Sequence, residues 1–193
     1  LESDVVVFSG GTSKGAGDIS YRIVHTLRNP GVVAHGVALK PGKPICLAVT
    51  DGKPVVILPG FPTSAIFTFH EFRAPVIRAF AGQPHERRHT VSATLPMRVN
   101  SERGRTEYLL VGLVQGPDGY LAYPMGKGSG SVTTFSGADG FITIDQHTEI
   151  LDAGSVVAVQ LLGQRLEPAD LVIIGSHCVG LDLLVGKLMR NGI

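Results

Sequence analysis

The sequence contains few cysteines and has no excess of charge of either sign. Cys46 and Cys178 are too few for a disulfide framework and lack the spacing of a metal site, so we expect free thiols in a reducing cytoplasm. The 17 basic and 16 acidic residues leave a net charge of +1, which gives no general attraction to nucleic acid or to an anionic membrane surface. Any anion-binding site must therefore be local.

Long hydrophobic runs are also missing. The apolar runs are as long as strands and are interrupted by glycine, proline or charge, which predicts neither a membrane span nor a signal peptide. A hydrophobic fraction of 44% over 193 residues, with 17% charged residues, is typical of a globular protein with a core. We expect a cytoplasmic protein whose partners include neither nucleic acid nor a membrane.

The sequence lacks an initiator methionine and polar tails. It opens at Leu1 directly before a strand pattern and closes at Ile193 directly after a helical pattern. These ends predict a fragment. We expect residues 1–193, expressed alone, to be poorly stable and inactive, because the terminal strand and helix patterns would lack packing partners.

A strand pattern followed by a glycine-rich turn opens the chain. Residues 5–8 are a continuous apolar run, typical of a strand covered on both faces, and the apolar spacing after Asp18 predicts a helix over 19–27. Such a turn before a helix favours phosphate binding, although an ordinary connection with Asp18 as the N-cap explains it equally well. The turn residues are Gly10, Gly11, Thr12, Ser13, Lys14, Gly15 and Gly17.

A second loop carries two lysines. Residues 35–39 predict a strand that continues into Lys40, Pro41, Gly42, Lys43 and Pro44. A rigid turn of this kind favours placing both ammonium groups near one phosphate or carboxylate, whereas a solvated loop has the same composition.

The third loop follows a predicted β-hairpin. Strands over 45–49 and 55–58 flank Asp51 and Gly52, a two-residue hairpin signal. Residues 58–65 then form a turn, with Thr63 or Ser64 as the N-cap of a helix that reaches residue 80 and either kinks or begins a new turn at Pro75. Because ligands in open α/β sheets bind beyond the carboxyl ends of strands, we expect the three loops to converge on one site.

The remaining chain predicts two further units. Residues 89–163 show short strands at 90–99, 107–114, 120–123, 141–144 and 155–162, which is typical of a small β-sandwich or barrel. The Gly- and Ser-rich residues 126–131 suit an anion, but an ordinary flexible loop has this composition too. Residues 169–193 predict one βα unit, with a strand over 170–175 and a helix carrying Leu181, Leu184, Val185 and Leu188.

The three loops, in this order, resemble the molybdopterin molybdenumtransferase family, which includes the bacterial MoeA proteins and the E domain of gephyrin. Residues 126–131 and 138–142 extend the resemblance to that family's C-terminal β-barrel. A shorter match over 175–184 resembles the start of a fused periplasmic-binding-protein-like domain. The resemblance implies that residues 1–83 are the C-terminal half of a three-layer α/β/α molybdopterin-binding domain, that residues 89–163 are the barrel, and that residues 169–193 begin a third, α/β domain.

The resemblance also implies an activity. The family inserts molybdate into adenylylated molybdopterin with the help of Mg²⁺ and releases AMP, acting as a homodimer. Asp18 would hold Mg²⁺ or position the anhydride, while Lys40 and Lys43 would neutralise molybdate or phosphate. The residues implied to bind the substrate are Gly10, Gly11, Thr12, Ser13, Gly15, Pro41, Gly42, Pro59, Gly60, Ser64 and Ser129, the last in a loop that faces the dimer partner.

The sequence departs from the family pattern at two points. Phe61 stands where many members have Asn, and the part of the family that precedes Leu1 is absent, so half of the site is expected here. The alternative function is a non-catalytic pterin-binding or scaffolding module with a fused small-molecule sensor domain. Retention of Asp18, Lys40 and Lys43 favours the enzyme.

Overall fold

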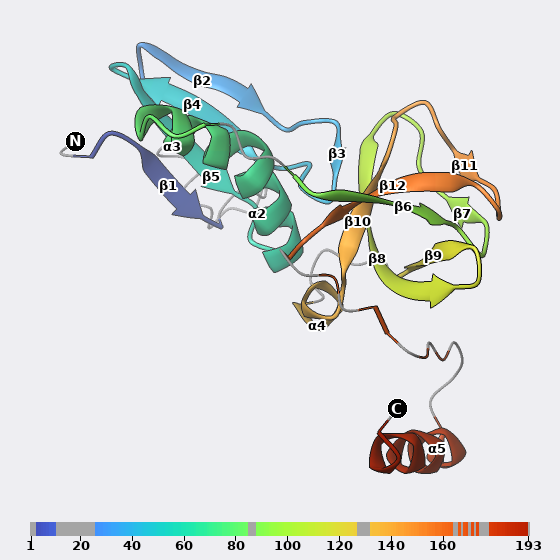
Figure 1. The fold of residues 1–193 in the computed structure, drawn as a ribbon. Helices are drawn as coiled ribbons and strands as arrows, with labels where there is room; N and C mark the ends of the chain where they lie inside the picture. The colour runs from blue at the N-terminus through green and yellow to red at the C-terminus, as the bar shows by residue number, and fades with distance from the viewer. Residues whose placement is uncertain are drawn as a thin grey trace.

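The computed structural model describes residues 3–10, 26–84, 88–126, 132–163, 166, 168–169, 171, 173 and 178–192. Within these ranges the chain forms an α/β unit and a β-barrel that lie side by side, followed by a C-terminal helix (Figure 1). Three predicted features lie outside the described residues: the turn over 11–18, most of the helix over 19–27, and the loop over 127–131.

The α/β unit is built on a four-stranded sheet. Its strand order is β1 (Val6–Ser9), β5 (Lys53–Leu58), β4 (Cys46–Thr50) and β2 (Pro30–His35), and only β1 and β5 pair in parallel. One face packs on the helical layer, where Ile45, Val56 and Leu58 meet Ala65, Phe69 and Phe72. The hairpin prediction is confirmed, because Asp51 and Gly52 have φ angles of 47° and 77° and join β4 to β5.

The helical layer is continuous but changes its pitch. It comprises α2 (Pro62–Thr68), the π-helical segment η1 (Phe69–Arg73) and α3 (Ala74–Phe80), with Pro75 in the first turn of α3. Of the two predicted alternatives at Pro75, a kink or a new turn, the structure has the start of a new helical segment. The predicted N-cap is wrong: Phe61 holds that position, because Pro62 suits the first helical turn and moves the start of the helix ahead of Thr63 and Ser64.

Two strand predictions in this unit are wrong. The strand expected over 35–39 is split into β2, which ends at His35, and β3 (Leu39–Lys40), because Gly36 has a φ angle of 88° and turns the chain. The first strand is present, but Val7 is 41% exposed instead of buried. Val7 pairs with Val56, so it lies on the face that the helical layer covers, but β1 is an edge strand of the described sheet and Val7 stays partly open to solvent.

The second unit is a closed barrel. Its strands pair in the order β8 (Thr106–Gly116), β9 (Gly119–Pro124), β6 (Thr90–Thr94), β12 (Val156–Leu161) and β10 (Gly140–Ile144), and β10 pairs again with β8. Closure leaves a buried interior that includes Leu95, Val111, Leu113, Ile142 and Val159. The predicted strand over 90–99 ends at Thr94. The short pair β7 (Val99–Asn100) and β11 (Ile150–Leu151) and the helix α4 (Val132–Ser136) were not predicted.

Strand β3 joins the two units. Leu39 and Lys40 pair in parallel with Thr106 and Glu107 of β8, so the lysine loop is attached to the outside of the barrel (Figure 1). The backbone N–H of Thr106 also donates to the carbonyl of Ala38 at 2.9 Å. This pairing fixes the position of the lysine loop relative to both units.

The C-terminal part contains the predicted helix. α5 (Val179–Arg190) begins at Cys178, whose Sγ accepts from the N–H of Leu181, and it lies away from both units in Figure 1. Residues 171 and 173 are not in a strand, and the rest of the strand predicted over 170–175 lies outside the described residues. The three-layer arrangement and the further βα unit therefore stay predictions. No helix within the described ranges is long and apolar enough to cross a membrane.

Candidate functional site

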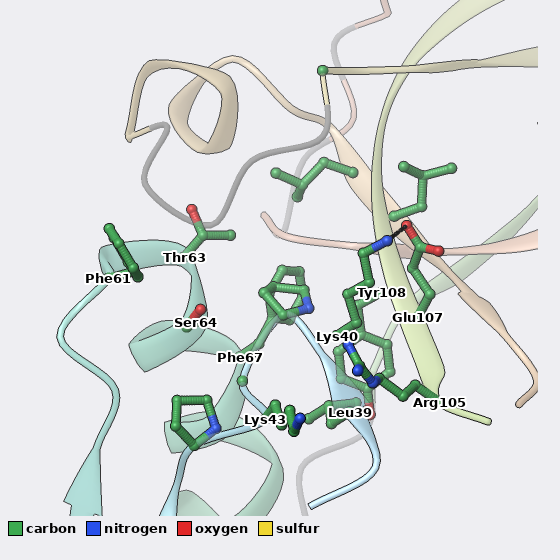
Figure 2. A pocket seen from close by; sticks show the side chains of 16 residues that line it. Leu39, Lys40, Lys43, Phe61, Thr63, Ser64, Phe67, Arg105, Glu107 and Tyr108 are labelled. Carbon is green, nitrogen blue, oxygen red and sulfur yellow. Dashed lines mark ion pairs between the residues drawn. The ribbon is translucent and has the colours of Figure 1, made fainter. Parts of the chain in front are cut away.

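A pocket of about 510 Å³ lies between the α/β unit and the barrel. The lysine loop at residues 40–44, the start of α2 and the first half of β8 form its walls (Figure 2). Five of the predicted site residues line it: Lys40, Pro41, Gly42, Lys43 and Ser64. Of the three loops predicted to converge, the second and third therefore meet at this pocket.

Three cationic side chains among the described residues line this pocket. Lys40 and Lys43 come from the α/β unit, and Arg105 comes from the barrel, one residue before β8. The Lys43 side chain is exposed and forms no ion pair with any residue that the structure describes. The pocket therefore combines positive charge from both units.

Arg105 was missed by sequence reasoning. Its distance along the chain from Lys40 follows no motif, and the two come together only because β3 pairs with β8. Its Nη1 lies 3.5 Å from Glu102 Oε2, and its side chain is 37% exposed, so part of the guanidinium surface remains open to solvent. The one local signal is a basic residue between the turn at Gly104 and a strand pattern.

Lys40 is held by two carboxylates of the barrel. Its Nζ lies 3.0 Å from Glu102 Oε1 and 3.6 Å from Glu107 Oε1 (Figure 2 draws the Glu107 pair). Glu107 is only 3% exposed, and its other oxygen accepts from Ser101 Oγ at 2.7 Å. A buried carboxylate with a hydroxyl donor and a lysine is well compensated, so Glu107 and Ser101 fix the direction of the Lys40 side chain.

The turn that carries the lysines packs tightly on α2. Gly42 has a φ angle of 123°, and a Cβ built on it would overlap Thr68 Cγ2 and approach the Ser64 carbonyl to 3.8 Å. Thr68 in turn donates from Oγ1 to that carbonyl at 2.7 Å. Glycine is therefore required at position 42 for both conformation and space.

Two hydroxyl side chains and one phenyl ring from the start of α2 complete this wall. Thr63 and Ser64 are 2% and 4% exposed, whereas Phe61 is 63% exposed at the edge of the pocket (Figure 2). Phe61 makes no side-chain hydrogen bond to the first turn, because it has no acceptor.

Other predicted residues lie beside this pocket rather than in it. Gly10 donates its N–H to the carbonyl of Leu58 at 3.0 Å, and its Cα lies 3.8 Å from a Cβ built on Gly60. Pro59, which separates Leu58 from Gly60 in the sequence, is fully buried. The first and third loops thus begin next to one another, while the predicted residues Gly11, Thr12, Ser13, Gly15, Asp18 and Ser129 lie outside the described residues.

An aromatic cluster closes the pocket on the barrel side. The Phe67 ring lies 5.1 Å from Tyr108, 5.9 Å from Phe135 and 5.0 Å from Phe141, measured between ring centroids. Burial raises the pKa of Tyr108 to about 12, and the neighbouring Glu71 carboxylate adds to this increase, while Arg88 opposes it. The Tyr108 phenol is therefore a neutral hydrogen-bond donor at physiological pH.

The described residues offer no metal centre. No group of three or more His, Cys, Asp or Glu side chains within the described ranges is arranged to hold a metal ion. Glu102 and Glu107, the carboxylates near the pocket, are engaged with Lys40. The described part of the site therefore suits an anion and does not fit Mg²⁺.

These features define a class of protein in which an α/β unit and a small β-barrel flank a pocket lined by cationic side chains. Residues 1–79 match the family model described as "Probable molybdopterin binding domain", and residues 92–162 match the one described as "MoeA C-terminal region (domain IV)". The chain belongs to the MoeA-type family of molybdopterin biosynthesis proteins.

Named relatives agree with this assignment. A putative molybdopterin biosynthesis protein of Methanocaldococcus jannaschii is 34% identical over 83% of this chain and 37% of its own length. A molybdopterin molybdenumtransferase of Synechocystis is 31% identical over 80% of this chain and 37% of its own length. The crystal structure of a molybdopterin biosynthesis MoeA protein from Pyrococcus horikosii matches with a TM-score of 0.66 and 37% identity, over 85% of this chain and 38% of that one. The chain thus spans well under half the length of these relatives.

Proposed function

We propose that this chain supplies part of the active site of a molybdopterin molybdenumtransferase, which inserts molybdate into adenylylated molybdopterin and releases AMP. The observation that carries the proposal is the pocket lined by Lys40, Lys43 and Arg105. Molybdate and the phosphoanhydride are both anionic, so cationic side chains in a partly enclosed site favour binding them. The names of the relatives supply molybdenum transfer to molybdopterin, while the adenylylated substrate and the release of AMP come from the family resemblance.

The three cations have different tasks in this proposal. Lys40, whose direction is fixed by Glu107, acts as a positioned point charge for an oxyanion. Lys43 and Arg105 are more exposed and add charge at the mouth of the pocket, where Arg105 also offers paired donors to two oxygens. Stabilising charge that develops on phosphoryl oxygens is the main contribution that such groups make to phosphoanhydride cleavage.

In this proposal Asp18 is the carboxylate that would hold Mg²⁺. The carboxylates that the structure describes at the pocket do not fit the cation, and Asp18 lies outside those residues. We expect Asp18→Asn to keep the fold and lose most AMP release, because Asn caps a helix about as well as Asp but is a poorer ligand for a hard cation. Unchanged turnover with an unchanged melting temperature would make Asp18 a simple cap.

The test is AMP release from adenylylated molybdopterin by the complete gene product, with molybdate and Mg²⁺ supplied. We expect Lys43→Ala and Arg105→Ala each to lower the rate, by roughly 10- to 100-fold, since removing one charged donor from a developing oxyanion costs this much or more. Lys187→Ala, on α5 and outside the pocket, is the matched control. Binding of the pterin without any AMP release would instead support the non-catalytic module.

We propose a cytoplasmic homodimer, in which residues 127–131, with Ser129, face the partner's site. The relatives are named for molybdopterin biosynthesis or molybdenum transfer, which supports this location. Light scattering on the complete gene product tests the dimer, and a monomer that still releases AMP would contradict it.

A further inference from the structure

Phe61 and its neighbours reverse the usual order of burial. The phenyl ring is 63% exposed, while the hydroxyl residues Thr63 and Ser64, two and three positions later, are almost fully buried. Large apolar side chains are normally buried and small polar ones exposed. The start of α2 therefore keeps an aromatic ring in water although buried positions lie next to it.

The ring does not serve the helix either. Phe61 is the N-cap residue of α2, a position at which Asn, Asp, Ser and Thr stabilise the first turn through a side-chain acceptor. Phenylalanine offers no acceptor, and no side-chain cap bond is present. A residue that contributes neither to the core nor to the cap is the kind of local inconsistency that functional sites show.

The position of the ring indicates what it contacts. Phe61 lines the same pocket as Lys40, Lys43 and Arg105 but approaches it from the α2 side (Figure 2). The pocket volume of about 510 Å³ is ordinary for a small-molecule site. A ligand that fills it would meet cations at one part and a flat apolar surface at another, which suits an anionic group attached to a planar ring.

We propose that Phe61 is a specificity residue that stacks on a planar nitrogen heterocycle of the substrate. The inference rests on the proposed function, because adenylylated molybdopterin contains two such rings, a pterin and an adenine, each linked to phosphate. A phenyl ring stacks on either without hydrogen bonds, so it selects for flatness rather than for one base.

The experiment measures affinity in the complete gene product by calorimetric titration with four probes: AMP, neopterin phosphate, ribose 5-phosphate and molybdate. We expect Phe61→Ala to lower the affinity for AMP, for neopterin phosphate or for both by about 5- to 100-fold, which is the usual effect of losing one stacked ring. Ribose 5-phosphate and molybdate, which have no ring to stack, keep their affinities. The probe whose affinity falls identifies the heterocycle that Phe61 contacts.

Three variants separate stacking from an effect on the fold. Phe61→Trp preserves the affinity for the ring-bearing probes. Phe61→Asn restores a capping acceptor, so its melting temperature is equal or higher while the affinity for the same probes falls. Phe80→Ala, which removes a phenyl ring that is 58% exposed on α3 outside the pocket, changes none of the affinities.

Two outcomes overturn the inference, and they are distinguishable. If the wild type binds AMP or neopterin phosphate and Phe61→Ala binds them equally well, Phe61 does not stack and the proposed function stands. If the wild type binds neither of these probes nor molybdate, the proposed function fails and the inference fails with it.

Discussion

Lys40 and Lys43 lie on one turn but have different surroundings. Lys40 is paired with the buried Glu107, whereas Lys43 is exposed. We expect Lys40→Ala to lower the free energy of unfolding by about 1–3 kcal/mol, because a buried carboxylate loses its cation. Lys43→Ala changes it by no more than about 0.5 kcal/mol, as is usual for exposed residues.

Binding measurements on the same two variants test whether the turn is only a solvated loop. Both should weaken molybdate affinity, and the weakening should shrink as salt is raised, because salt screens exposed charges. Thermal unfolding together with calorimetric titration at two ionic strengths measures both effects. Molybdate affinities equal to wild type in both variants would make the turn an ordinary solvated loop.

Arg73 is a buried cation without a described partner. It is 0% exposed on η1, and its Nε, Nη1 and Nη2 atoms have no hydrogen-bond partner among the described residues. Burial lowers the pKa of this guanidinium. An unsatisfied buried charge is costly, so we expect Arg73→Met to raise stability by about 1–3 kcal/mol.

Urea unfolding of Arg73→Met tests this expectation. Arg190→Met on α5, where the side chain is exposed, serves as the control and should leave stability nearly unchanged. A less stable Arg73→Met variant would mean that the guanidinium binds a group outside the described residues.

Tyr108 makes the free energy of unfolding depend on pH in the alkaline range. Its folded-state pKa of about 12 exceeds that of an unfolded tyrosine, near 10, so the unfolded chain loses the phenolic proton first. The stabilisation is complete below pH 10 and is lost as pH rises towards 12. Unfolding free energies measured from pH 9 to 12 should therefore fall less steeply in Tyr108→Phe. Parallel curves for both proteins would show that the phenol is not protected.

At the scale of elements, Phe67 of α2 connects the two units. It is 4% exposed and packs on Tyr108, Phe135 and Phe141 of the barrel side. Truncating a buried phenylalanine removes its apolar contacts and leaves a cavity, so Phe67→Ala should cost about 3–5 kcal/mol. The exposed Phe80 provides the control, because Phe80→Ala should cost far less. Equal losses in the two variants, measured by denaturant unfolding, would show that the aromatic cluster does not hold the units together.

Local signals predicted some elements and failed at others for physical reasons. The hairpin at Asp51 and Gly52 was predicted because both residues favour positive φ, a property of the residues themselves. The division between β2 and β3 was not predicted, because Gly36 has no side chain to interrupt the apolar pattern. Helix α4 is a short element inside a chain of strands, for which periodicity carries little information.

The candidate site was predictable only as far as it lies on one unit. Lys40, Gly42 and Ser64 belong to loops that sequence patterns place at strand ends, and the structure brings them together. Arg105 and Glu107 depend on the parallel pairing of β3 with β8, which joins residues far apart in the chain. No periodicity within a single segment encodes such a contact.

At the scale of the whole molecule, the parts differ in how completely they are packed. The barrel closes on its own strands and buries its own interior. The α/β unit is tied to it by β3 and by Phe67, so the lysine loop should be protected together with β8. In contrast, α5 has no buried residue and exposes Val179, Leu183 and Met189.

This difference predicts the order of proteolysis. Brief trypsin treatment should cut first after Lys187 and Arg190 on α5, because a protease acts on segments with few packing contacts. The barrel strands, from Thr90 to Leu161, should remain longest as one resistant product, since cutting them requires opening a closed sheet. Mass spectrometry of timed samples identifies the products. If α5 survived as long as the barrel, another part of the protein would have to cover its apolar side chains. Loss of the barrel before the α/β unit would mean instead that its stability depends on the units joined to it.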